Sequence, residues 1–580
     1  STPGVQVTVQ PMAGRMRAGR HGVWSWGYGI FGGLGHGSYG HSLKPQRISL
    51  LGLGSGQSEG SSDVDINHIS CGWTTNIAVT TDGHMYEWGW ERNIKSLVQC
   101  GRRFSGMRAY LERLQGLNLG WMTFNMARSL TPVKLSKMRI VDRFQESTQD
   151  ANRSRGVESD AAGRNAGAKK ASGEIGNSSG SLLSALGESF LGPRDSISLA
   201  TGDKEDGNED LLIPLLTVNA DTVRIVRVDS GSEFSAALSD DGRLFTWGTG
   251  IRGQLGHGED FYSSTMDIPT EIVLPGIGLH RRIIDFTCGF QYLIAIDDHG
   301  EAWGCGKGST GCLGLIRLEA DELDRRRFQL VNINQDNLAF HMSDRKTKKT
   351  QKSSSQDRTD FLPQVSTVSA GMNHTLFLTN DGEVWGCGRN NNLELALPDF
   401  ADRWGPTHID LRSLLESQGR ETLACEEKVV KVSAGNMHSV ALTSEGRVVT
   451  WGMNRHGQCG VAMDRSRVNA NTELYRHLAE TAMPTPPTIL RVDESTCPEL
   501  LRGMEDQQPR VKDVYAGFYD TFLVLECGSL IRVGAGINGG SNMDTNQSPE
   551  MQYVEASGLK VSQVASSWRH VLVRAESSSG

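Results

Sequence analysis

The stretch Val226–Gly258, VRVDSGSEFSAALSDDGRLFTWGTGIRGQLGHG, contains three short runs of alternating apolar residues. The first run ends at the break Ser230-Gly231, and the second and third flank the turn Asp241-Gly242. Alternation of this kind is typical of short strands, and Asp-Gly between two such runs favours a tight hairpin. A glycine-rich loop follows the third run. The stretch therefore predicts a small antiparallel β-meander.

The same order of features recurs along the chain, which indicates a repeat architecture. The ends of the third strands occur at Trp26-Gly27, Trp88-Gly89, Trp247-Gly248, Trp303-Gly304, Trp385-Gly386, Trp451-Gly452 and, in degenerate form, Val533-Gly534. The breaks between the first two strands occur at Cys71-Gly72, Ser230-Gly231, Cys288-Gly289, Ala370-Gly371, Ala434-Gly435, Ala516-Gly517 and, weakened, Ser566-Ser567. Both landmarks give seven units, which predicts an all-β fold, a seven-bladed β-propeller.

The two ends of the chain carry complementary fragments of the repeat. The last unit stops after the apolar run Val571–Val573, with no hairpin turn behind it, whereas an unpaired strand pattern around Trp24 and Trp26 opens the first unit. An open ring would leave unpaired strand edges, and a blade shared by both ends removes them. We therefore predict closure of the ring by N-terminal and C-terminal strands in one sheet.

These motifs resemble the repeat of the regulator of chromosome condensation family, which carries Gly-Gln-Leu-Gly, an Ala-Gly break, a following His and Trp-Gly. Gly253–Gly256 matches the first motif fully, Gly457–Gly460 with one change, and Gly32–Gly35 and Gly311–Gly314 more loosely. The resemblance extends from Gly22 to Val573 apart from insertions. It implies a seven-bladed propeller and leaves the function to be argued from the site.

Unequal spacing of the landmarks predicts loop insertions within one domain. We expect an N-terminal extension at 1-21, a single propeller at 22-576, and insertions at 92-131, 145-220, 316-362 and 461-510. Helical spacing of apolar residues indicates a helix within 104–130, and a second candidate helix lies at 471–481. Residues 145–210 are rich in Ser, Gly and charge, a composition typical of disorder. The insertions are thus expected to be partly helical or disordered.

Composition narrows the class of protein. The chain has 580 residues and a net charge of -8, which argues against a generally nucleic-acid-binding surface, and no apolar run suggests a membrane span. Several of the 10 Cys share repeat positions, for example Cys305 with Cys387, which favours reduced structural thiols and an intracellular protein. The segment Ser1–Ser58 has no acidic residue but contains Arg. We expect a cytoplasmic or mitochondrial location, a nuclear one being less favoured.

No motif predicts catalysis, a cofactor or a metal. Two Gly-x-Gly-x-x-Gly matches, at 27–32 and 248–253, recur with the repeat and precede no helix, so a tight turn is the better interpretation. His374, His438 and His570 share one repeat position, with no nucleophile or carboxylate at constant spacing, which indicates structural hydrogen bonding rather than a catalytic triad. The cysteines lack paired zinc spacing. We expect no enzyme.

The loops after the breaks are the candidate partner site. The family resemblance implies that one propeller face engages a small GTPase through acidic and His side chains in these loops, yet only two acids occur there. Aromatic residues dominate instead, as at binding hot spots, although they could equally seal the blade ends. The candidate partner-binding residues are Trp73, Glu233, Phe290, Tyr292, Phe518, Tyr519, Asp520 and Trp568. We predict a non-enzymatic scaffold for protein partners; the alternative is a guanine nucleotide exchange factor.

A basic cluster near the end of the third insertion offers a second candidate contact. It consists of Arg345, Lys346, Lys348, Lys349 and Lys352. A solvated loop is one interpretation. A contact with an anionic partner, such as RNA or an acidic protein surface, is the other.

Overall fold

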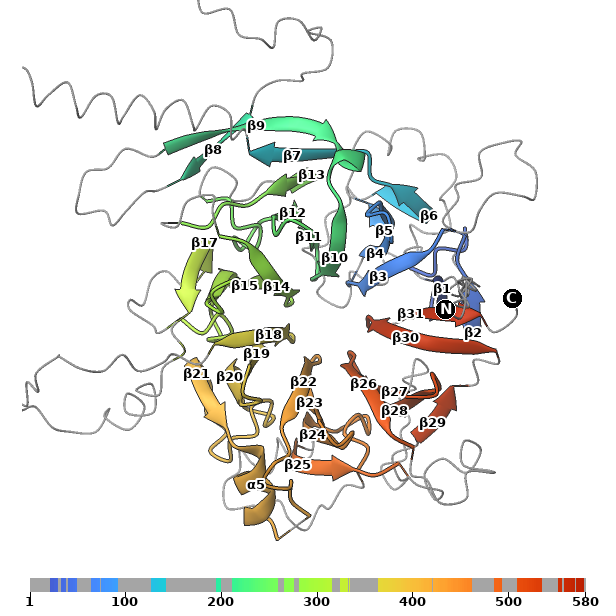
Figure 1. Cartoon of the computed structure of the whole chain (residues 1–580), viewed down its shortest axis with the longest axis vertical. Helices are drawn as coiled ribbons and strands as arrows, with labels where there is room; N and C mark the ends of the chain where they lie inside the picture. Colours follow the sequence, from blue (N-terminus) through green and yellow to red (C-terminus); the bar gives the residue numbers. More distant parts are fainter. Residues whose placement is uncertain are drawn as a thin grey trace, which may run out of the picture.

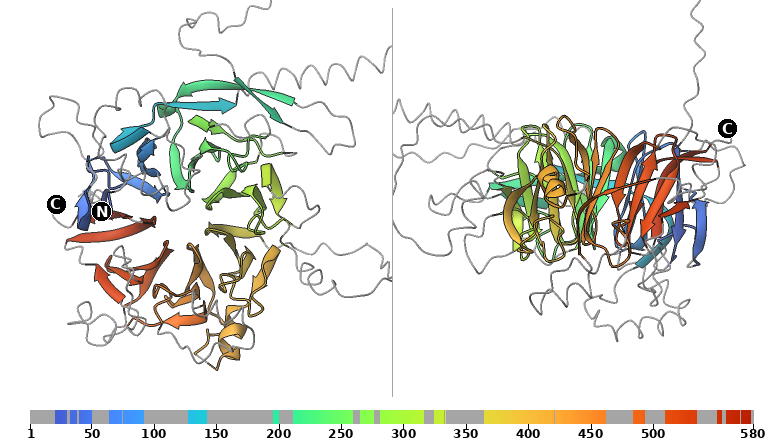
Figure 2. Two further views of the ribbon diagram at one scale, coloured as in Figure 1. Left: turned by 180° about the vertical axis from the view of Figure 1, so that it is seen from behind. Right: turned by 90° about the horizontal axis from the view of Figure 1, so that it is seen from below.

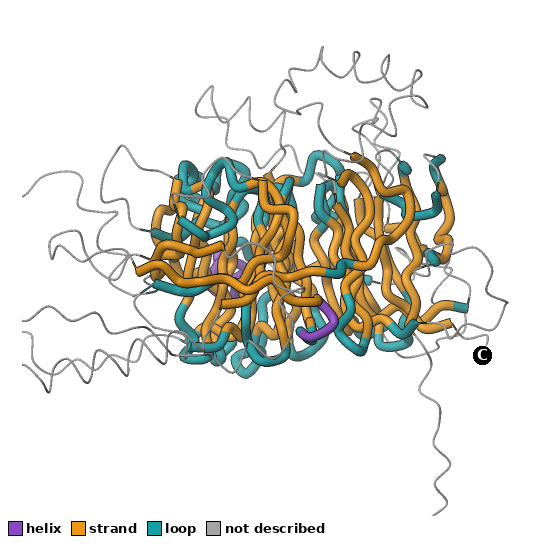
Figure 3. The backbone as a smooth tube through the Cα atoms, turned by 90° about the horizontal axis from the view of Figure 1, so that it is seen from above, coloured by secondary structure: helices purple, strands orange, loops and turns teal. Residues whose placement is uncertain are grey.

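The computed structural model describes residues 21–29, 33–37, 40–49, 64–73, 75–91, 127–141, 195–199, 211–258, 265–275, 281–315, 324–331, 333, 364–419, 421–461, 484–492, 509–534, 551–554, 558–568 and 570–577. Within them, seven sheets are arranged radially around a central axis (Figure 1). Seen edge-on, the ring is a disc with strands running across its thickness (Figures 2 and 3). The predicted all-β, seven-bladed propeller is confirmed.

Each blade contains four antiparallel strands, numbered here from the channel outward, and the blades are numbered I to VII around the ring. Blade I contains β30 (Leu559–Ser566), β31 (His570–Ser577), β1 (His21–Gly27) and β2 (Ser42–Arg47). Blade II contains β3 (Ile66–Cys71), β4 (Thr75–Thr80), β5 (Met85–Glu91) and β6 (Ala127–Lys134); blade III contains β10 (Ile225–Ser230), β11 (Phe234–Ser239), β12 (Leu244–Thr249) and β13 (Thr265–Glu271).

The remaining four blades follow in chain order. Blade IV contains β14 (Ile283–Cys288), β15 (Tyr292–Asp297), β16 (Ala302–Lys307) and β17 (Asp324–Val331); blade V contains β18 (Val365–Ala370), β19 (His374–Thr379), β20 (Val384–Gly388) and β21 (Arg403–Ile409). Blade VI contains β22 (Val429–Ala434), β23 (His438–Thr443), β24 (Val448–Met453) and β25 (Pro484–Leu490); blade VII contains β26 (Val511–Ala516), β27 (Asp520–Leu525), β28 (Leu530–Gly534) and β29 (Met551–Val554).

The hydrophobic core lies between the blades. Seven clusters of buried apolar side chains occur among the described residues, and each draws its members from two neighbouring blades. Second strands such as β11 are buried at every position, because a blade packs against a neighbour on both faces. No blade can therefore bury its apolar surface alone.

Ring closure takes place in blade I, as predicted. Strand β1 pairs with β31 in antiparallel register, with Trp24 opposite Val573 and Trp26 opposite Val571. Trp24 and Trp26 pack into the cluster shared with blade VII, whereas Val23, on the other face, packs against blade II. One N-terminal strand thus completes two inter-blade junctions.

The outer strand of each blade was missed by the sequence analysis. Strands β6, β17 and β25 lie wholly or partly inside the predicted insertions 92-131, 316-362 and 461-510, so part of each supposed insertion belongs to a blade. Most of these outer strands contain proline, which an edge position tolerates because one backbone edge needs no partner. The prolines are Pro45, Pro132, Pro269, Pro406, Pro484, Pro486 and Pro487.

Two of the Trp-Gly landmarks mark a different repeat position from the others. Gly248 pairs with Phe234 at the start of the second strand, but the residues in that place in blades IV and V are Gly306 and Gly388, not Gly304 and Gly386. Trp303 and Trp385 therefore lie two residues early, and a cysteine takes the usual Trp place. A two-residue shift keeps a side chain on the same face of a strand, so the indole side chain still packs in the core.

Three further strands extend blade III outward. Strand β7 (Lys137–Val141) bridges the outer strand β13 in parallel and pairs with β9 (Leu211–Asn219), which in turn pairs with β8 (Asp195–Leu199) (Figure 1). The described parts of the predicted insertion 145-220 are thus strands and a short 3-10 turn, η5 (Ala220–Thr222), rather than helix. Met138 is fully buried in the cluster between blades II and III, so this extension is packed onto the ring.

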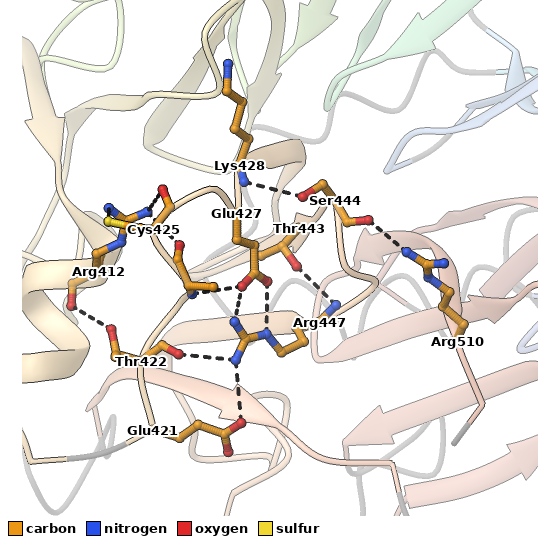
Figure 4. A network of polar contacts seen from close by, with 11 residues as sticks. Arg412, Glu421, Thr422, Cys425, Glu427, Lys428, Thr443, Ser444, Arg447 and Arg510 are labelled. Carbon is orange, nitrogen blue, oxygen red and sulfur yellow. Dashed lines mark hydrogen bonds and ion pairs between the residues drawn. The ribbon is translucent and has the colours of Figure 1, made fainter. Parts of the chain in front are cut away.

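The one α-helix among the described residues, α5 (Leu411–Ser417), begins a linker between blades V and VI. A buried ion pair holds this linker: Arg447 Nε donates to Glu427 Oε1 at 2.9 Å, and Arg447 Nη1 donates to the carbonyl of Thr422 at 3.2 Å (Figure 4). Arg412 donates to the carbonyls of Ala424 and Cys425 (Figure 4). The linker is thereby tied to the β23–β24 hairpin. The helices expected within 104–130 and at 471–481 lie outside the described residues apart from the start of β6.

Deleting residues 1–27 tests closure. Loss of β1 removes Trp24 and Trp26 from one junction and Val23 from another, and a buried Trp alone contributes about 3–5 kcal/mol. We expect the free energy of unfolding of the whole protein to fall by at least about 5 kcal/mol, measured by urea denaturation followed by circular dichroism. Deleting only residues 1–20, which retains β1, is the control. An unchanged midpoint for the longer deletion would contradict this closure.

Candidate functional site: the channel and its aromatic mouth

The inner strands of all seven blades line a central cavity of about 720 Å³. Alternate residues of each inner strand turn toward it, because alternate residues of a strand share a face. The polar residues of these strands that line the cavity include His68, Ser70, Arg227, Asp229, Thr287, Thr367, Ser369, Lys431, Ser433, Tyr515 and Gln563. The channel wall is therefore polar.

Side chains of the wall connect each blade to the next. The inner edge of each first strand exposes backbone N–H groups that need acceptors. Asp229 accepts from the N–H of Cys288 at 2.7 Å, and Thr287 Oγ1 accepts from that of Ala370 at 3.1 Å. The same bond recurs from Ser369 to Ala434 (2.9 Å) and from Ser433 to Ala516 (2.8 Å). At the closing junction Gln563 Oε1 accepts from Ile69 at 3.1 Å.

Four aromatic side chains meet at one end of the channel, and we call them the aromatic mouth: Trp73, Phe290, Phe518 and Trp568. Each lies two residues beyond the end of an inner strand. The ring of Trp73 stands edge-on to Phe290 at a centroid distance of 4.7 Å and lies 6.3 Å from Phe518 and 6.0 Å from Trp568. Trp73 thus reaches across the channel, and the half-buried cluster covers this end.

The other four predicted site residues divide between the mouth and the interior. Tyr519 packs edge-on against Phe518 at 4.6 Å and is half-buried, so it extends the mouth. Tyr292 is 1% exposed and its hydroxyl donates to the carbonyl of His374 at 2.6 Å. Glu233 is buried, and buried Asp520 accepts from Arg532 at 3.2 Å. These three side chains therefore have little surface to offer a partner.

The histidines of the repeat bond across the junctions between blades. His374 Nε2 lies 2.9 Å from Ser439 Oγ, and that hydroxyl donates to the carbonyl of Glu394, so it must accept from an N–H of His374. The break glycine permits this packing, because a Cβ on Gly371 would lie 2.5 Å from His374 Cε1. His438 bonds Thr521 in the same way. Their inferred role, structural hydrogen bonding, matches these contacts.

A cysteine does lie beside one of these histidines, which the sequence analysis did not foresee. Cys71 Sγ is 3.2 Å from His570 Nε2. Asn76 donates its amide to the carbonyl of Gly33, so its Oδ1 faces His570 Nε2 at 2.8 Å and requires an N–H there. That nitrogen has no lone pair for the thiol proton, and burial raises the pKa of Cys71 to about 12. Cys71 is not an activated nucleophile.

Among the described residues, three potential metal ligands gather once, at Asp297, Asp298 and His299. The carboxylate of Asp297 is already taken, because Arg281 and the indole N–H of Trp303 both donate to it. The Arg281 guanidinium adds a positive charge beside the group. This arrangement does not suit a cation.

Fold and site together define a seven-bladed propeller with a polar channel and an aromatic mouth. Two family profiles, both described as Regulator of chromosome condensation (RCC1) repeat, match the chain: one at residues 225–254, 365–393 and 429–458, the other at 20–79, 241–296 and 381–442. The matched stretches are RCC1 repeats within a seven-bladed propeller, as the motifs indicated.

Relatives with this repeat are distant. The Ultraviolet-B receptor UVR8 of Arabidopsis thaliana is 23% identical over 447 residues, which are 77% of this chain and 76% of the relative. The RCC1 domain-containing protein RUG3, mitochondrial, of the same plant is 26% identical over 262 residues, which are 40% of this chain and 55% of that protein. The match thus spans about half of RUG3.

A solved structure supports the fold. The structure of Prp20p from Saccharomyces cerevisiae, titled with its binding properties to Gsp1p and histones, superposes with a TM-score of 0.54 at 15% identity, covering 97% of this chain and 92% of that one. In the described part of the chain, no helix is long and apolar enough to cross a membrane.

The buried histidines predict acid sensitivity. Burial lowers the pKa of His438 from 6.5 to about 3, so the unfolded chain takes up a proton at a pH where the native one does not. The contribution of neutral, buried His438 to the free energy of unfolding is fully present above pH 6.5. It is lost as pH falls toward 3, at about 1.4 kcal/mol per pH unit. His438→Gln should flatten the fall in unfolding free energy between pH 6 and 4 by about this slope, measured by urea denaturation. Exposed His41→Gln is the control, and equal slopes would refute the assignment.

Proposed function

We propose that this protein is a non-enzymatic scaffold that docks a protein partner on the aromatic mouth. The observation that carries the proposal is the cluster of Trp73, Phe290, Phe518 and Trp568, half-buried at the end of the channel. Large aromatic rings held rigidly by one another offer contact area at a small entropy cost, which is why they dominate binding hot spots. Tyr519 adds a hydroxyl at the rim.

The chemistry of the channel supports a binding role rather than catalysis. Among the described residues, the histidines of the repeat lie in hydrogen bonds between blades, and the thiol beside His570 is held protonated. The metal-ligand types that gather at Asp297 are engaged by Arg281. None of these histidines, thiols or carboxylates is positioned to act as a nucleophile or general base.

The alternative is a guanine nucleotide exchange factor for a small GTPase. The acids that such a role would use, Glu233 and Asp520, are buried, and Asp520 is paired with Arg532. Within the described residues 249–258, the segment after Trp247 forms a regular turn in which Gly253 and Gly256 adopt positive φ. The scaffold function is therefore favoured.

We infer an intracellular location, cytoplasmic or mitochondrial. All eight cysteines in the described residues are free thiols, as expected for a reducing compartment. A relative named as mitochondrial supports that option without deciding it. The basic cluster Arg345–Lys352 lies outside the described residues, and an anionic partner there stays a prediction.

Truncating the mouth should weaken partner binding without unfolding the ring. Trp73→Ala with Phe518→Ala removes two rings whose aromatic neighbours are other residues at this end of the channel, so we expect a roughly 30-fold loss of affinity, about 2 kcal/mol. The measurement is quantitative mass spectrometry of proteins retained by the immobilised full chain, followed by titration of the partner found. Leu43→Ala, at an exposed apolar residue (80%) outside the mouth, is the control. Equal retention by the wild type and the double variant would exclude the mouth as the docking site.

Nucleotide exchange should be absent. Because both candidate acids are buried, we expect no acceleration of GDP release from a Ran-like small GTPase at micromolar protein, measured with a fluorescent GDP analogue. A clear acceleration that falls in Glu233→Gln or Asp520→Asn would establish the alternative function and displace the scaffold.

A further inference from the structure

Two cations and two acids stand at the third position of the inner strands, and of these four only the cations line the cavity. Arg227 and Lys431 stand in blades III and VI, and Asp285 and Asp513 in the blades that follow them. Each cation forms an ion pair with the acid of the next blade. Blades III and VI lie on opposite sides of the seven-membered ring, so the two pairs face one another across the cavity.

The carboxylates of Asp285 and Asp513 are engaged in hydrogen bonds and ion pairs within the protein. Asp285 accepts from Arg227, from the N–H of Phe286 at 2.9 Å and from that of Val368 at 3.1 Å. Asp513 accepts from Lys431, from the N–H of Val514 at 2.8 Å and from the hydroxyl of Tyr515 at 2.6 Å. Their acceptor capacity is thus directed into the protein rather than toward the lumen.

The cations keep unused donors. A guanidinium carries five N–H donors and an ammonium three. Within the described residues Arg227 is held by Nη1 on Asp285 and by the face of Phe286, and Lys431 by Asp513 and the ring of Tyr515, 3.8 Å away. Both side chains remain about one third exposed, at 33% and 32%, and both line the cavity. Their remaining donors are available to a solute in the channel.

Other groups make the lumen favourable for negative charge. Burial first, then the charges of Arg227, Arg574 and Lys431, lower the pKa of His68 to about 3, which shows that these cations share one region. The carboxylate of Asp229, which also lines the cavity, accepts from Ser70, from the N–H of Ser230 and from the N–H of Cys288, so its oxygens are engaged by the wall. His68 Nδ1 is a buried nitrogen without a hydrogen-bond partner among the described residues.

We propose that the central channel binds a small oxyanion, bearing phosphate or carboxylate groups, between Arg227 and Lys431. The carboxylates of the wall are engaged in hydrogen bonds within the protein, whereas Arg227 and Lys431 keep N–H donors for the channel. The complementary solute is therefore one with several acceptor oxygens. A planar guanidinium suits paired oxygens, and an ammonium opposite it suits a second charged group. A cavity of about 720 Å³ holds a molecule with two or more such groups. The aromatic mouth covers one end of this site.

Isothermal titration of the full chain with pyrophosphate and with citrate, at constant ionic strength set by potassium chloride, tests the proposal. We expect saturable one-to-one binding of at least one of the two. Preference for pyrophosphate would identify a phosphate ligand, and preference for citrate a carboxylate ligand. Binding of neither probe to the wild-type protein would overturn the proposal.

Four variants locate the site. Lys431→Met and Arg227→Gln should each weaken binding at least tenfold, and Lys431→Arg should restore most of it. Thr367→Asp places a negative charge on the wall of blade V without breaking an ion pair, so it should also weaken binding at least tenfold even if Lys431→Met fails to fold. Melting temperatures establish which variants are folded.

Lys512→Met provides the matched control. Lys512 lies on an inner strand beside Asp513, is exposed, and does not line the cavity. It should bind the probes as tightly as the wild type. Equal weakening by Lys512→Met, or unchanged binding by folded Thr367→Asp, would show that the anion binds elsewhere and would overturn the site.

Discussion

The channel-facing edge of each inner strand sets the constraint on which the propeller depends. One edge pairs with the second strand, and the other exposes backbone N–H groups toward the lumen, where each needs an acceptor. Side chains of the preceding blade supply it, as Ser369 does for Ala434 and Ser433 for Ala516. These bonds have a direction, since at five of the seven junctions a side chain of one blade accepts from a backbone N–H of the next blade. A linear stack would leave one unsatisfied blade at each end, and blade I, built from both ends of the chain, removes both.

Features that repeat locally were accessible from sequence. The break glycines, the hairpin turns and the missing C-terminal strand gave seven blades and their closure, because each is a local requirement on backbone conformation. The outer strands were not accessible, since β25 (PTPPTIL) reads as a loop and is a strand only because an edge position tolerates proline. Position in the repeat could have separated the buried candidate residues from those at the mouth. Tyr292 and Asp520 occupy the same repeat position as the buried His374.

The contacts that long-range packing creates could not be read from spacing. Trp73 of blade II and Phe518 of blade VII are separated by most of the chain, yet their rings lie 6.3 Å apart because ring closure leaves only blade I between these two blades. The same holds for Cys71 and His570, whose 3.2 Å contact suggests a catalytic pair until the bond to Asn76 assigns the proton. Geometry brought these residues together, and the hydrogen-bond network then decided what chemistry they can perform.

Packing between blades and the proposed docking surface therefore use different residues of the same short loop. In blade IV, Phe290 follows the break and turns to the mouth, where it meets Trp73, whereas Tyr292, two residues later, turns inward and bonds blade V. The members of the aromatic mouth belong to none of the seven inter-blade clusters. If the mouth docks a partner as we propose, a change there alters what the protein can bind while the junctions stay intact, and a change at the inward position opens a junction. One repeat unit can thus keep the ring closed and vary its binding surface independently.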